Sequence, residues 1–161
     1  MVDKSDLAAD PYSDAMTLAL YALAPRAKSR AELHSQLLKR GVEPEVSAAV
    51  LDSLELQGLL NDLEFAQIWN ESRRRQKKLS SSAITQELRG KGVAPDIIEE
   101  VMQGSDVDAE YQMAFELAER KYRSCAHLDQ MVIYRRVHSL LARKGFSHQI
   151  TERIMRELLA S

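Results

Sequence analysis

Two dense runs of basic side chains are the residues of this sequence best suited to binding chemistry. Between Arg73 and Lys91 there are seven Lys or Arg residues and one acid, Glu87. Between Arg120 and Lys144 there are again seven basic residues and one acid. Such runs attract phosphates or acidic protein surfaces through charge, and salt weakens that attraction. We therefore take both runs as candidate binding surfaces.

The candidate partner-binding residues come from these two runs. They are Arg73, Arg74, Arg75, Lys77, Lys78, Arg89, Lys91, Arg135, Arg136, Arg143 and Lys144. The first run is the denser and lies centrally in the chain, so we expect it to be the main functional surface. The second run is the competing candidate for that role.

Acidic stretches separate the basic runs. From Glu43 to Glu71 there are seven acids and no Lys or Arg, and from Asp96 to Glu119 there are eight acids and again no base. The formal net charge is therefore only −2 at pH 7. A nearly neutral chain can still present a strongly basic local surface when its charges alternate in blocks.

Catalytic and metal-binding patterns are missing from the sequence. It contains no glycine loop for phosphates and no zinc-protease motif. The four histidines are scattered without i, i+4 pairing, and the single Cys125 excludes an internal disulfide framework. We therefore expect a protein that is not an enzyme and uses no metal or other cofactor.

The sequence also predicts a cytoplasmic protein with no membrane partner. Its longest uncharged apolar run, from Ala15 to Ala24, is shorter than the ~20 residues that a bilayer span requires. Asp3, Asp6 and Asp10 make the N-terminal stretch acidic, which is the opposite of a signal peptide.

Helices must position the basic side chains, because apolar residues recur at helical spacing throughout the chain. The series Ala15, Leu18, Ala19 and Ala22 is one example. Helix-start signals agree, with a cap and a following proline at 10–11 and a capping box formed by Ser29 and Glu32. No stretch alternates apolar and polar residues as a strand would. The fold class predicted is all-α.

A helix, a glycine turn and a second helix recur around Gly41, Gly92 and Gly145. Each glycine has a leucine four residues before it and aliphatic residues eight before, five after and nine after. Arg or Lys comes directly before each glycine, which we expect to adopt the left-handed conformation past a helix end. Because another helix precedes each copy, the sequence predicts three tandem three-helix repeats in an elongated, curved array of small bundles. The predicted repeats are 10–58, 59–104 and 105–161.

The most distinctive segment runs from Gly58 to Arg74 and reads GLLNDLEFAQIWNESRR. By itself it predicts a turn, a cap at Asn61 or Asp62, and a helix with an apolar face. It resembles the G-L-[LI]-D-D-x-x-[FY]-A-x-x-[WF]-x-x-x-R hallmark of the RecX family, regulators of the bacterial recombinase RecA. The positions that carry the hallmark's structural role are Gly58, Leu60, Asp62, Phe65, Ala66 and Trp69.

The resemblance extends over about 14–159 and implies both a fold and a function. The implied fold is three tandem three-helix repeats. The implied function is a binding protein that lies in the groove of the RecA–DNA filament and mainly inhibits recombination, strand exchange and ATP hydrolysis. One departure is Leu79-Ser80-Ser81-Ser82, which stands where many members have a glycine-containing turn. No heptad seam is visible, so we expect a monomer.

Two other functions fit parts of the pattern. A helix-turn-helix-like DNA-binding regulator would use the helix–glycine–helix units, and weak direct binding to single- or double-stranded DNA would fit either function. However, the second helix of the first two units is acidic and lacks bases, and only the third unit offers Arg153 and Arg156 there. A helical scaffold for another protein also matches the repeat spacing.

Overall fold

The structure is a computed structural model that describes residues 10–160. Its helices are α1 (Pro11–Leu23), α2 (Arg30–Lys39), α3 (Pro44–Leu56), α4 (Asp62–Ser72), η2 (Arg73–Lys77), α5 (Ser81–Gly90), α6 (Pro95–Met102), α7 (Val107–Ser124), α8 (Gln130–Arg143) and α9 (His148–Ala160). No strand occurs within 10–160. The predicted all-α class is therefore confirmed.

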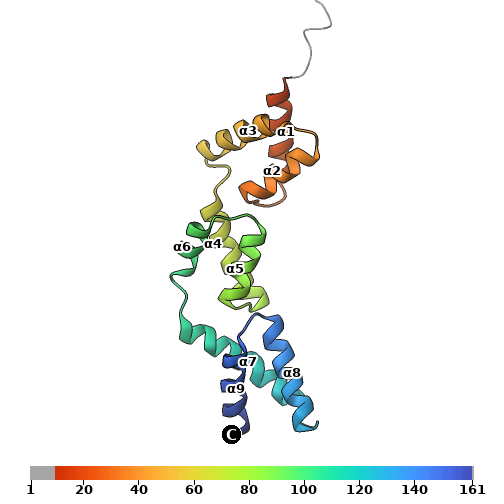
Figure 1. Ribbon diagram of the computed structural model, residues 1–161, viewed down its shortest axis with the longest axis vertical. Helices are drawn as coiled ribbons and strands as arrows, with labels where there is room; N and C mark the ends of the chain where they lie inside the picture. Colours follow the sequence, from red (N-terminus) through yellow and green to blue (C-terminus); the bar gives the residue numbers. More distant parts are fainter. Residues whose placement is uncertain (1–9, 161) are drawn as a thin grey trace, which may run out of the picture.

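Three small helical bundles follow one another along the length of the molecule, which is elongated (Figure 1). The first bundle is α1–α3, the second α4–α6 and the third α7–α9, and each has its own cluster of buried apolar side chains. Leu33, Ile84 and Val137, which the repeat pattern matches to one another, are each fully buried in their own cluster. The predicted three tandem three-helix repeats are confirmed.

Local sequence signals set where the helices begin. The side chain of Asp10 accepts a hydrogen bond from the Tyr12 backbone N–H, and Ser29 and Glu32 form the full capping box. Asn61, not Asp62, caps α4, because its side chain accepts from the Glu64 N–H. Each cap satisfies a backbone donor that the first helical turn leaves unpaired.

The three glycine turns adopt the left-handed backbone that the repeat pattern predicts. Gly41, Gly92 and Gly145 have φ values of 84°, 72° and 88°. In each turn the residue after the glycine donates its N–H to the carbonyl of the buried leucine in the last turn of the helix before it. We call these turns, each with the basic residue before its glycine, the glycine corners.

The chain after α4 departs from a regular α-helix. Arg73–Lys77 form a single π-helical turn, η2, and Lys78 then adopts a left-handed backbone with φ of 54°. The left-handed residue is thus a lysine placed just before the Leu79-Ser80-Ser81-Ser82 stretch. Because η2 and Lys78 interrupt the helix, the basic residues there do not continue one regular helical face.

Within the residues that the structure describes, no helix is both long enough and apolar enough to cross a membrane.

Candidate partner-binding surface

The glycine corners of the second and third bundles are the places where neighbouring bundles meet. A Cβ atom at Gly92 would lie 2.3 Å from Cβ of Ala31, near the start of α2. A Cβ atom at Gly145 would lie 2.5 Å from both Cβ of Ala83 and Oγ of Ser80, at the start of α5. Helices α8, α5 and α2 are therefore joined end to end, and the negative end of one helix dipole meets the positive end of the next.

The first joint connects the corner after α5 to the beginning of α2. Ser29 Oγ donates to the Lys91 backbone carbonyl at 2.5 Å, and Lys91 Nζ donates to Glu32 Oε1 at 2.7 Å. From the first turn of α4, Asp62 Oδ1 accepts from the backbone N–H of Arg30 at 2.8 Å. Asp62 therefore satisfies the N-terminus of α2 in the neighbouring bundle, although we expected it as a candidate cap of its own helix.

The surroundings of this joint shift the pKa values of its two carboxylates, Glu32 and Asp62, in opposite directions. Burial acts to raise the pKa of Glu32, but hydrogen bonds from Arg26, Lys91 and Ser29 outweigh it and lower the pKa from 4.5 to about 2. Burial raises the pKa of Asp62, and the Arg30 N–H offsets only part of that rise. Glu32 is thus the carboxylate whose charged form the joint stabilises.

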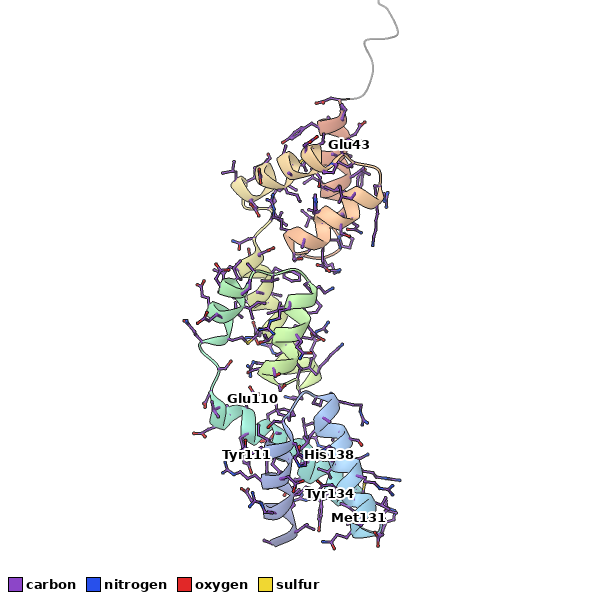
Figure 2. The ribbon with its side chains drawn as sticks, in the orientation of Figure 1. Glu43, Glu110, Tyr111, Met131, Tyr134 and His138 are labelled. Carbon is purple, nitrogen blue, oxygen red and sulfur yellow. The ribbon has the colours of Figure 1, made fainter. Side chains whose placement is uncertain are left out.

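The second joint connects the corner after α8 to the beginning of α5. The backbone N–H of Ser80 donates to the Lys144 carbonyl at 2.9 Å, and Lys144 Nζ donates to the Lys77 carbonyl at 2.6 Å. Glu110 lies near the start of α7, between the second and third bundles (Figure 2). It accepts hydrogen bonds from both the backbone N–H and the hydroxyl of Ser81.

Arg74 adds a further link at the second joint. Its guanidinium donates to the hydroxyls of Ser81 and Ser105, the latter at 2.9 Å, and its Nε donates to Asn70. It also lies 3.6 Å from Glu110, and only about a quarter of its side chain is exposed. Arg74 therefore ties the end of α4 to the start of the third bundle.

The structure divides the first basic run into bonded and exposed side chains. Arg73 forms an ion pair with Glu87 at 2.8 Å, and Arg74 and Lys91 belong to the joints. The exposed members are Arg75, Lys77, Lys78 and Arg89, of which Arg75 pairs with Glu71 one turn earlier. Not all of the run therefore faces a partner.

Trp69 is half-buried and packs against the core of the second bundle. Its ring stacks on the buried Phe65, with centroids 5.6 Å apart, and its Nε1 donates to Glu87 at 2.9 Å. The Arg73 guanidinium lies 4.0 Å from its ring centroid and the Lys91 ammonium 5.0 Å. Trp69 thus makes cation–π contacts with Arg73 and Lys91 and also packs against the core of the second bundle.

The second basic run forms a groove on α7 and α8. Arg135, Arg136 and Arg143 are exposed on α8, and together with Lys121 of α7 they line an open groove of about 480 Å³. Lys121 was not among the predicted site residues, because only the antiparallel pairing of α7 with α8 brings it beside them. No acidic side chain lines this groove.

The two basic runs adjoin each other at the second joint. Lys144, at the end of the second run, binds the carbonyl of Lys77 in the first run. What we call the basic surface comprises the exposed bases Lys77, Lys78, Arg135, Arg136 and Arg143 together with the partly buried Lys121. This surface spans the second and third bundles.

A histidine contact also lies on the third bundle. The His138 and His148 rings approach with Nε2 and Nδ1 3.2 Å apart, and the ring of Tyr134 stacks on His138 (Figure 2). Sequence spacing did not reveal this pair, because the two residues lie on different helices. Among residues 10–160, no group of three or more His, Cys, Asp or Glu side chains is arranged to hold a metal ion.

Family models and relatives match nearly the whole chain. Models of the first, second and third three-helix domains of RecX match residues 15–54, 61–102 and 108–155. The regulatory protein RecX of Mycobacterium avium (strain 104) is 42% identical over 148 residues, which cover 91% of this chain and 86% of that protein. The regulatory protein RecX of Streptomyces coelicolor is 35% identical over 157 residues, covering 98% of this chain and 84% of that protein.

A solved structure shares the fold. The crystal structure of RecX from Lactobacillus salivarius aligns with a TM-score of 0.81 and 22% sequence identity. The alignment covers 95% of this chain and 99% of that one. At this identity the similarity concerns the fold alone, and it agrees with the stacked three-helix bundles.

Proposed function

Because the chain belongs to the RecX family of regulatory proteins, we propose that it binds the filament of RecA on DNA and inhibits it. Inhibition would act on filament growth, ATP hydrolysis and strand exchange during recombination and DNA repair. The relatives are named as regulatory proteins, with no catalytic activity indicated. The protein would act in the cytoplasm, as a monomer and without a cofactor.

The basic surface is the observation that carries this proposal. Arg135, Arg136 and Arg143 line a groove with no acid among its lining residues, and the exposed Lys77 and Lys78 add basic charge on the second bundle. Such a surface attracts DNA phosphates or an acidic face of RecA. The remaining predicted contact residues, Arg73, Arg74, Arg75, Arg89, Lys91 and Lys144, would then position or flank this surface.

The shape of the molecule supports a filament as partner. Three bundles in a row form an elongated body (Figure 1), and a body of this kind can touch more than one subunit of an extended assembly. Hydrogen bonds at the second joint connect the second and third bundles, and would keep the two parts of the basic surface adjacent.

The helix-turn-helix alternative receives less support from the charges. Helix α3 carries Glu45, Asp52 and Glu55 and no base, and α6 is likewise acidic. Phosphates would repel both helices from a major groove. In α9, Arg153 pairs with Glu157 and lies over the ring of Tyr111, so part of its basic charge is already engaged.

ATP hydrolysis by RecA on single-stranded DNA, with and without this protein, tests the proposal. We expect hydrolysis to fall as the protein is added, at concentrations where its affinity for the same DNA without RecA is weak. Tight DNA binding with unchanged hydrolysis would instead indicate a DNA-binding regulator. No effect in either assay would favour a scaffold for another protein.

A further inference from the structure

A pocket on the first bundle lies apart from the basic surface. It has a volume of about 250 Å³ and is lined by Leu18, Tyr21, Ala22, Pro25, Lys28, Gln36, Leu37 and Arg40. Leu37 is only 2% exposed, whereas Tyr21 is 75% exposed. The lining of the pocket therefore combines a buried apolar side chain with an exposed aromatic ring. Two cationic side chains and no acidic side chain belong to the lining.

In the second bundle, the corresponding space is occupied by the indole ring of Trp69. The ring lies between α4 and the end of α5, where its N–H donates to Glu87 and the Lys91 ammonium faces it. Arg73 covers the ring at 4.0 Å. A half-buried aromatic ring there is held by one acceptor and two cations.

The repeat pattern relates the two places residue by residue. The matched positions, counted back from Gly41 and Gly92, are Leu18 with Trp69, Gln36 with Glu87, and Arg40 with Lys91. A leucine stands in place of the indole, and the pocket of about 250 Å³ lies beside it. Meanwhile the hydrogen-bonding and cationic side chains at the end of α2 are retained.

We propose that this pocket binds an aromatic side chain, best a tryptophan, in an acidic segment of a partner protein. The side-chain oxygen of Gln36 can accept the indole N–H as Glu87 does, and Arg40 can face the ring as Lys91 does. Lys28 and Arg40 would attract carboxylates that flank the aromatic residue. At protein interfaces, one buried aromatic anchor residue surrounded by a charged rim commonly contributes much of the binding free energy.

The pocket and the basic surface can be tested separately, because they lie on different bundles. The probe is a fluorescein-labelled, C-terminally amidated peptide Asp-Glu-Trp-Glu-Asp, and fluorescence anisotropy measures its binding to the full chain. We expect replacement of its tryptophan by alanine to weaken binding about tenfold. Equal affinity for the two peptides would overturn the proposal.

A variant that fills the pocket gives the sharper test. Leu18→Trp places an indole where the second bundle has one, so we expect it to fold and to weaken peptide binding about tenfold. Arg89→Gln, which removes an exposed base from the second bundle, is the control and should bind as the wild type does. Unchanged peptide binding by a folded Leu18→Trp protein would overturn the proposal.

Two further measurements cover the remaining outcomes. The peptide should shift the backbone amide NMR signals of Ala22 and Leu37, and shifts confined to other bundles would contradict the site, even if Leu18→Trp fails to fold. An oligothymidylate that displaces the peptide, and binds the Leu18→Trp protein more weakly, would identify a nucleobase as the occupant and overturn the choice of a protein partner.

Discussion

In the first and second joints, the serine that caps the next helix donates to the carbonyl before the corner glycine, but the donor atom and the partner of the corner lysine differ. The Lys91 carbonyl accepts from the Ser29 hydroxyl, whereas the Lys144 carbonyl accepts from the Ser80 backbone N–H. The ammonium groups of Lys91 and Lys144 also have different partners. Lys91 binds the Glu32 carboxylate, whereas Lys144 binds the backbone carbonyl of Lys77.

The first joint is therefore structural, whereas the second also positions part of the basic surface. At the first joint, the charge of Lys91 is neutralised by Glu32, so little of it is available to a partner. At the second, Lys144 binds the carbonyl of Lys77 and thereby holds the two basic runs next to each other. The third corner, at Gly41, has nothing within 4 Å of where its Cβ would lie. Gly41 therefore provides a glycine corner without a neighbouring helix against it, with which the other two corners can be compared.

The largest effect is expected at the first joint, where Trp69 supports Lys91. Trp69→Ala removes a ring that packs on Phe65, so we expect a loss of ~3–5 kcal/mol in the free energy of unfolding, measured by urea denaturation. Unchanged unfolding together with lost inhibition of RecA would instead make Trp69 a contact residue.

The glycine corners allow a direct comparison of the joints. Gly92→Ala and Gly145→Ala each combine a left-handed side chain with an overlap at the neighbouring helix, so we expect each to cost ~2–4 kcal/mol in unfolding free energy. Gly41→Ala is the matched control, with the left-handed backbone and no overlap, and should cost about 1 kcal/mol. Equal losses at all three glycines would contradict end-to-end joints.

Arg74 and Arg75 separate joint residues from surface residues within one run. Arg74→Ala removes hydrogen bonds to Ser81 and Ser105 at the second joint, so we expect a loss of ~1–3 kcal/mol in unfolding free energy. Arg75→Ala removes only an exposed pair with Glu71 and should cost less than about 0.5 kcal/mol. Similar losses for both variants would argue against a structural role for Arg74.

Acid should weaken the first joint through Glu32. Because the folded pKa of Glu32 is lowered to about 2 from 4.5, its contribution to stability is present above about pH 4.5 and is lost as the pH falls toward 2. Glu32→Gln removes this titration, so its melting temperature should fall less steeply than that of the wild type over that range. Parallel pH profiles of the two proteins would contradict this assignment.

The sequence was sufficient for features that depend on neighbouring residues. The capping box at Ser29 and the left-handed glycine corners were predicted, because each needs only a few consecutive residues of the right type. The three-helix repeats followed from the spacing of buried leucines around Gly41, Gly92 and Gly145.

The sequence was insufficient where partners lie far apart in the chain. Arg74 meets Glu110 and Lys91 meets Glu32 only after bundles have stacked, so the first run could not be divided into bonded and exposed bases beforehand. Lys121 joins the groove of α8 for the same reason. The π-helical turn and the left-handed Lys78 also carried no recognisable local signal.

The most direct test of the account is RecA ATP hydrolysis on single-stranded DNA, measured with three charge-matched double variants. Lys77→Gln with Lys78→Gln changes the second bundle's part of the basic surface, and Arg135→Gln with Arg143→Gln changes the third bundle's part. The control, Lys39→Gln with Arg156→Gln, removes two exposed bases elsewhere.

We expect each of the first two variants to need about tenfold more protein for half-inhibition, while the control inhibits as the wild type does. All three should unfold at nearly the wild-type temperature, because exposed bases contribute little to stability. Wild-type inhibition by either of the first two variants, or an equal loss in the control, would contradict a basic surface that spans the second joint.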